Sequence, residues 1–156
     1  MTLESKLNLE EDTLKGLVDL IQVNIDSSEG MAAAADKVDD NRVAAVMRDI
    51  AQARANNARE LQSYVIANAK EPPTEGSTAG AIHRGWTSMR SAINGGDPYV
   101  ILIEAERGED RIKEQYEDVL RKTSGSAVND VLQRHYAEVK KGHDQIRDLR
   151  DIYKFK

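Results

Sequence analysis

Carboxylates and one histidine lie at spacings that could bring them together on the faces of helices. Glu106 and Glu109 are three residues apart, a separation that places two side chains on the same face of an α-helix. Glu138 and His143 follow farther along the chain. Carboxylate oxygens and imidazole nitrogens bind divalent metals such as iron and manganese. These four residues are therefore candidate ligands of one metal site, provided that the fold brings their helices together.

The same region also supports an interpretation that needs no metal. Arg54 and Asn57 fall on or beside the apolar stripe of one expected helix, and Glu109 falls inside the stripe of another. Because buried charges are usually paired, an inward arginine that faces an inward glutamate gives the better charge balance. Asn57 and His143 would complete a buried hydrogen-bond network around this pair. The sequence favours the network over the metal site.

The composition indicates which elements must position these side chains. The chain has 156 residues, of which 40% are hydrophobic, 31% are charged and only 4% are aromatic. A core of Ala, Val, Ile and Leu with Glu, Lys and Arg outside is typical of helices, whereas β-sandwiches use more aromatic and β-branched residues. We therefore expect one all-α domain over residues 1–156.

Charge, cysteine content and hydropathy argue against several classes of function. The net charge is −5 and basic residues alternate with acidic ones, so we expect no nucleic-acid partner. The chain has no cysteine, which excludes disulfides, thiolate metal sites and a cysteine nucleophile. No apolar run is long enough to span a bilayer and no secretory signal is recognisable, so we expect no membrane association and a cytoplasmic location.

Apolar spacing and capping signals predict four long helices and one short helix. The long helices are expected over residues 9–38, from a polar connection at 39–41 to 69, over 98–122, and from a turn at 123–126 to 153. The predicted N-caps are Asn8, Asp39 or Asp40, Asp97 and Ser126. The first helix is expected to carry an apolar stripe at Leu14, Val18, Ile21, Ile25, Ala32 and Ala35. Beside it, Leu17, Leu20 and Met31 form a second stripe, a candidate dimer interface.

A long connection, residues 70–97, joins the second long helix to the third. Most of it is predicted to be a short amphipathic helix over 78–93, with Ile82, Trp86, Met89 and Ile93 on one face and Trp86 as its anchor. Two helical hairpins joined by one long crossover make a four-helix bundle of ferritin-like connectivity. A simple up-down-up-down bundle, with the short helix capping one end, stays open as the alternative.

Two short segments resemble a bacterial family of unknown function within the ferritin-like superfamily. They are GAIHRGW at residues 80–86 and AERGED at 105–110, and residues 17–27 and 137–151 are similar as well. The resemblance covers almost the whole chain and implies a bundle related in architecture to rubrerythrins and bacterioferritins. It implies no known reaction. By superfamily analogy alone, it suggests an accessory protein in stress physiology.

Ferritin-like di-iron proteins use one Glu from each of two helices and a Glu-x-x-His pair from each of the other two. This chain contains no Glu-x-x-His, and Arg54 and Asn57 stand where an acid and a histidine would be expected. We therefore expect no cofactor, with iron or manganese at a degenerate site as the weaker possibility. The expected function is a non-catalytic or weakly metal-binding bundle that forms homo-oligomers, most simply a dimer. A ferroxidase or peroxidase and a helical protein-interaction module are the alternatives.

Overall fold

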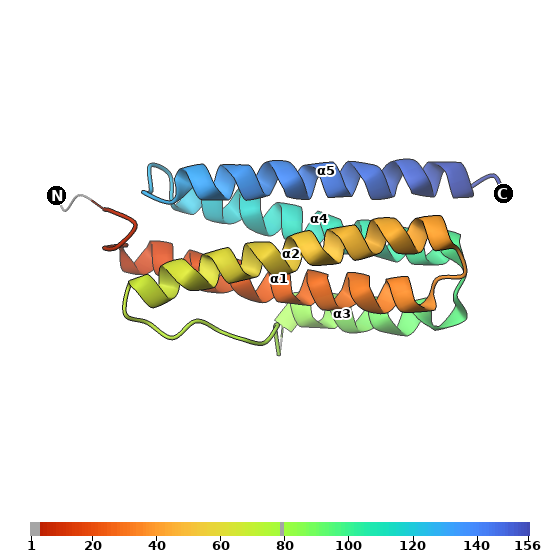
Figure 1. Cartoon of the computed structure of the whole chain (residues 1–156), viewed down its shortest axis with the longest axis horizontal. Coiled ribbons are helices and arrows are strands. Elements are labelled where there is room, and N and C mark those ends of the chain that lie inside the picture. The colour runs from red at the N-terminus through yellow and green to blue at the C-terminus, as the bar shows by residue number, and fades with distance from the viewer. Residues whose placement is uncertain (1–3, 79) are drawn as a thin grey trace.

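The computed structural model describes residues 4–78 and 80–156, and these residues form five α-helices and one 3₁₀ helix (Figure 1). The elements are α1 (Glu11–Lys37), α2 (Asn41–Ala67), α3 (Gly80–Ala92), η1 (Ile93–Gly95), α4 (Pro98–Lys122) and α5 (Asn129–Tyr153). The expected all-α class is confirmed. Within the described ranges, none of these helices combines the length and the apolar character that a membrane crossing requires.

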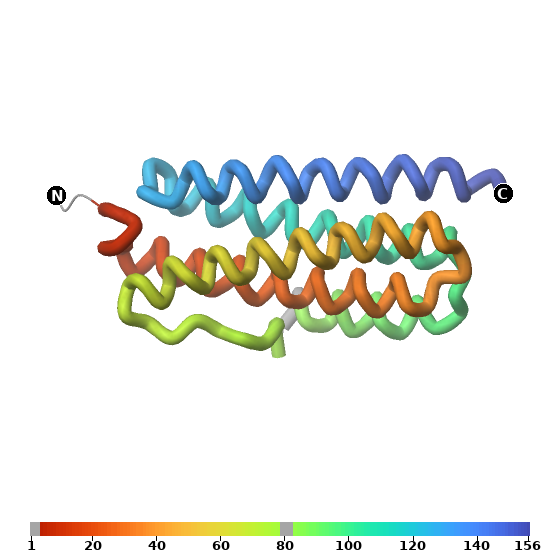
Figure 2. Tube along the Cα trace, in the orientation of Figure 1, coloured from red at the N-terminus to blue at the C-terminus, as the bar shows by residue number. Residues whose placement is uncertain are grey.

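The connection between α2 and α4 spans the length of the molecule. The end of α2 lies beside the start of α1, where the Leu9 amide donates to Asn68 Oδ1 at 2.8 Å. The start of α4 lies at the other end of α1, where the Asp39 amide donates to the Gly96 carbonyl oxygen at 2.9 Å. The chain therefore enters α4 in the same direction as it ran through α2, as Figure 2 traces. A short helix that only caps one end is excluded.

The four long helices lie side by side, with α3 against two of them (Figure 1). Helices α1 and α2 form one antiparallel hairpin, and α4 and α5 form the other. Helix α1 also packs against α4, and α2 packs against α5. Helix α3 covers the groove between α1 and α4. Each long helix thus presents one face to a shared interior.

The inner face of α1 is wider than predicted. Leu17, Leu20 and Met31 are 0% exposed and belong to the core, so the proposal that they form a dimer surface is wrong. Ala32 of the predicted stripe is exposed, and Val18 is only partly buried. The physical reason is that α1 packs against α2, α3 and α4, which cover more of its circumference than a single stripe does. The homodimer stays a prediction, and it needs another surface.

Two of the predicted helix caps are confirmed. Asp40 Oδ1 accepts a hydrogen bond from the amide of Val43 at 3.0 Å. Asp97 Oδ1 accepts one from the amide of Tyr99 at 2.9 Å, and Pro98 occupies the first helical position. Each cap satisfies an amide that the helix itself leaves without a partner.

Two other predicted caps are wrong, because each of these residues makes a different contact. Asn8 exchanges backbone hydrogen bonds with Ser5, and α1 begins after Glu10 without a side-chain cap. Ser126 precedes the start of α5 by three residues, and its hydroxyl donates to Glu4 Oε1 at 2.8 Å. The N-terminal segment therefore fastens the turn before α5, which no local signal indicates.

Trp86 fixes α3 in the groove between α1 and α4. Its side chain is 2% exposed, and the groove has room for it because glycines face its ring from both helices. A β-carbon on Gly30 of α1 would lie 2.9 Å from the ring, and one on Gly108 of α4 would lie 2.8 Å from it. The Arg111 guanidinium lies 5.5 Å from the ring centroid. Trp86 therefore anchors the crossover as expected; the side chain of Ile82 lies outside the described residues.

Candidate functional site

A buried ion pair joins α2 to α4 in the interior. Arg54 Nη2 lies 2.6 Å from Glu109 Oε2, and the two side chains are 1% and 0% exposed. From α1, the Ser27 hydroxyl reaches the other oxygen of Glu109 at 3.4 Å. From α5, Gly142 makes room for the guanidinium, since a β-carbon there would lie 2.7 Å from Arg54 Nη2. All four long helices therefore shape the surroundings of this pair.

The helix faces explain why these charges point inward. Glu109 lies between Ala105 and Ile112 on the buried face of α4, and both neighbours are 0% exposed. Arg54 follows Ile50 by one turn on the buried face of α2. Removing either charge from water costs several kcal/mol, which only a close partner of opposite charge offsets. The sequence predicted that these two residues face each other, and the structure brings them together.

The other two residues of the predicted network do not bind the pair. Asn57 is buried, but its Nδ2 has no hydrogen-bond partner among the described residues. The side chain of His143 lies near the surface and faces α4, and its Nε2 is 2.7 Å from Asp110 Oδ1. Ser27 and Gly142 complete the surroundings of the pair instead.

A second polar group connects all four long helices through consecutive hydrogen bonds. Asn24 Nδ2 on α1 donates to the Tyr116 hydroxyl oxygen on α4 at 2.8 Å. The Tyr116 hydroxyl lies 3.0 Å from His135 Nδ1 on α5, and His135 Nε2 lies 2.6 Å from Glu60 Oε1 on α2. Arg134 donates to the second oxygen of Glu60 at 2.7 Å. The group therefore extends from the buried Asn24 to the part-exposed carboxylate of Glu60.

The surroundings of this group determine its charge state. Burial lowers the pKa of His135, and the hydrogen bond to Glu60 only partly opposes that shift. Burial also raises the pKa of Tyr116 well above its ordinary value. The hydrogen bond from Arg134 lowers the pKa of Glu60. At neutral pH the group therefore contains a neutral phenol, a neutral imidazole and a charged carboxylate, with Tyr116 donating to His135 and His135 donating to Glu60.

His135 should make the stability of the protein depend on pH. Its folded-state pKa lies below the unfolded value of about 6.5, so the unfolded chain takes up the proton first. The wild type is therefore expected to keep the full contribution of His135 above about pH 6.5 and to lose it progressively as the pH falls. His135→Gln, which keeps a hydrogen-bonding side chain but does not titrate, should flatten this dependence in urea unfolding at pH 5, 6 and 7. His83→Gln, at a partly exposed histidine, is the control. Parallel pH profiles for wild type and His135→Gln would show that His135 is not the responsible group.

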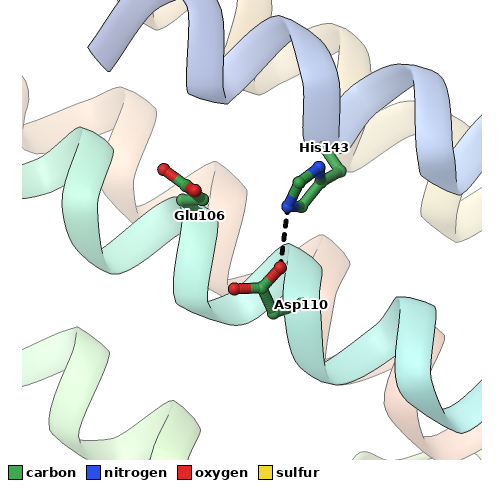
Figure 3. A group of neighbouring side chains, drawn as sticks. All are labelled: Glu106, Asp110 and His143. Atoms are coloured by element: carbon green, nitrogen blue, oxygen red, sulfur yellow. Dashed lines mark ion pairs between the residues drawn. The ribbon is translucent and has the colours of Figure 1, made fainter. Parts of the chain in front are cut away.

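A third group of side chains lies at the surface between α4 and α5 (Figure 3). Glu106 and Asp110 come from α4, and His143 comes from α5. One ligand-type atom from each lies within 4.8 Å of the other two. Glu106 also forms an ion pair with Arg150 of α5. Oxygen and imidazole ligands of this kind suit divalent transition metals.

Only two of the four predicted metal ligands meet. Glu106 and His143 lie in the surface group, whereas Glu109 is held inside by Arg54. Glu138 is exposed on α5, beside a shallow depression between α2 and α5. The sequence did not single out Asp110, although its position four residues after Glu106 places both on one face of α4.

A family model described as domain of unknown function DUF2383 matches residues 12–122, more than two thirds of the chain. The chain therefore belongs to the DUF2383 family. The DUF2383 match runs from α1 to the end of α4, so it includes Arg54, Glu109 and Trp86, while α5 follows it. No curated protein matches the chain.

The sequence patterns did not predict the second polar group, which consists of Asn24, Glu60, Tyr116 and His135. Three of its members lie within the DUF2383 match. A signal for it exists in the sequence. Tyr116 and His135 fall on the apolar stripes of their helices, where a polar side chain needs a partner from another helix. Asn24 falls off the stripe predicted for α1 but lies inward in the structure, at 0% exposure. The partners become recognisable only when the rotation of each helix is known.

Proposed function

We propose that this protein is a ferritin-like four-helix bundle that works without a di-iron centre, as an accessory helical protein and not as an oxidoreductase. Two antiparallel hairpins joined by a connection that spans the molecule support the ferritin-like assignment. The observation that carries the metal-free assignment is the 2.6 Å contact between Arg54 and Glu109, both almost completely buried. Membership of DUF2383 is compatible with this function and adds no activity.

The interior side chains do not fit a di-iron centre. Such a centre takes four carboxylates and two histidines from the four helices of the bundle. Around the ion pair the helices supply Ser27, Arg54, Glu109 and Gly142, which include a single carboxylate. That carboxylate already neutralises a guanidinium, so a metal cation here would add buried positive charge without ligands to balance it. The positive charge that a metal would supply is provided by Arg54.

The ion pair has a structural role in this proposal. It joins α2 to α4, which belong to different hairpins and run in the same direction. Any rotation or one-residue slip of either helix would separate two charges that have no water to solvate them. The pair therefore favours the alignment of the two hairpins in which the two charges meet. A uniquely aligned bundle suits a protein that presents a fixed surface.

Metal content tests the proposal. Protein purified without an affinity tag or chelator, from cells supplied with iron and manganese, should retain far less than two metal ions per chain after dialysis against EDTA. Elemental mass spectrometry measures this, and oxidation of added Fe²⁺ in air should be no faster than in buffer. The matched variant Glu109→Gln should leave both readings unchanged. Two EDTA-resistant ions per chain that disappear in Glu109→Gln would overturn the proposal and favour a ferroxidase.

A further inference from the structure

We propose that Glu106, Asp110 and His143 bind one divalent transition-metal ion at the surface between α4 and α5. This site is separate from the interior ion pair, and it does not depend on the proposed function. Two carboxylates and one imidazole form a ligand set that binds zinc, manganese and other divalent first-row transition metals. Three protein ligands also leave room for water in the remaining coordination positions.

The three side chains lie close together. Figure 3 shows Asp110 extending from α4 to the ring of His143, with Glu106 nearby on the same helix. The three ligand atoms lie within 4.8 Å of one another. Bonds of about 2.0–2.2 Å to one ion require ligand atoms roughly 3.3 Å apart, so small rotations about side-chain bonds suffice. Glu106 and His143 are only 15% and 14% exposed, which limits how far they can move away.

The contacts of His143 provide a second observation. Its Nδ1 lies 3.2 Å from Asp144 Oδ1, and its Nε2 lies 2.7 Å from Asp110 Oδ1. With a carboxylate at each nitrogen, the single N–H of a neutral imidazole serves one of these contacts, and a metal ion can occupy the other. Metal-binding histidines usually donate their second N–H to a carboxylate, which orients the ring. Asp144 is placed to play that part while Nε2 faces the ion.

Arg150 competes with the ion for one ligand. Its guanidinium pairs with Glu106, and it also donates to Asp151 Oδ1 at 2.8 Å. A metal ion that binds Glu106 competes with Arg150 for this carboxylate, and Arg150 also has Asp151 as a partner. The competition lowers the affinity of the site, and it gives the proposal a distinctive consequence. Removal of Arg150 should strengthen metal binding, whereas removal of a ligand should weaken it.

Calorimetric titration of the tag-free, full-length protein with zinc chloride tests the site. We expect one Zn²⁺ per chain in the wild type. His143→Ala and Asp110→Asn should each weaken binding by at least about 10-fold, since the loss of a ligand costs no less than the loss of its outer-shell partner. Arg150→Gln should strengthen it several-fold, a gain that a misfolded variant could not produce. Glu114→Gln, at an exposed acid on the same helix, is the matched control and should bind as the wild type does.

Three outcomes would overturn the proposal. One is the absence of zinc binding by both the wild type and Arg150→Gln up to millimolar concentrations. Another is wild-type affinity in Asp110→Asn and His143→Ala. The third is binding that survives in those two variants but is lost in Glu109→Gln, which would place the metal in the interior and overturn the proposed function as well. Circular dichroism of each variant establishes that the helices are intact before the titrations are compared.

Discussion

Replacing Glu109 with alanine is expected to lower the free energy of unfolding by about 3–5 kcal/mol. The substitution leaves the guanidinium of Arg54 at 1% exposure with its partner carboxylate removed, and only the approach of water or a distortion of the bundle could solvate it. Since domains of this size are stable by about 5–15 kcal/mol, the loss is a large part of the total. Urea unfolding followed by circular dichroism at 222 nm measures it.

Two further variants separate the ion pair from ordinary packing. Glu114→Ala removes an exposed acid from the same helix and should change stability by less than about 0.5 kcal/mol. The double variant Arg54→Met/Glu109→Leu replaces the pair with apolar side chains and should be close to the wild type in stability, or above it. If Glu109→Ala costs no more than Glu114→Ala, the carboxylate is not buried as described.

Trp86→Ala is expected to cost about 3–5 kcal/mol, the second largest effect. The substitution removes the indole that fills the space left by Gly30 and Gly108, and the two glycines have no side chains with which to close the cavity. Helix α3 should lose stability first, because it packs mainly against α1, α4 and the adjoining η1, and Trp86 lies at that contact. Hydrogen exchange followed by mass spectrometry should therefore show faster exchange in residues 83–95 than in α2 or α5.

The size of the aromatic side chain offers a graded control for this experiment. Trp86→Phe keeps a ring between the glycines and should lose less stability than the alanine variant. Thr87→Ala, at the exposed neighbouring position, should leave the exchange of α3 unchanged. Equal exchange of α3 in the wild type and in Trp86→Ala would mean that the crossover is held by other contacts.

The sequence predicted the fold more fully than the site, for a physical reason. Some helix ends follow from local signals. Helix α4 begins at the predicted residue 98 because Asp97 and Pro98 act within one turn, and it also ends at the predicted residue 122. Arg54 and Glu109 could also be recognised, because a charge inside an apolar stripe is conspicuous on a single helix. Their mutual contact then follows from the cost of leaving either charge alone.

The remaining site residues depend on how each helix is rotated against its neighbours. Ser28 falls between Ile25 and Ala32 on the spacing of the stripe predicted for α1. In the structure it is Ser27 that reaches Glu109, and Ser28 donates to the carbonyl oxygen of Ala51. A difference of one residue rotates a side chain by about 100° around the helix. Asp110 and His143 meet only because α4 and α5 align as they do. Such pairings depend on how whole helices pack against one another, and a short sequence motif does not predict that packing.

Arg54 and Glu109 belong to different hairpins, and this determines when their ion pair can form during folding. Arg54 and Glu109 are 55 residues apart in the chain, and the whole crossover lies between them. Each hairpin can form from nearby contacts, but the two charges meet only once the hairpins have docked. An interaction that forms after the rate-limiting step leaves the speed of assembly unchanged and slows its reversal. Arg54 and Glu109 would then determine the lifetime of the native state more than the rate at which it is reached.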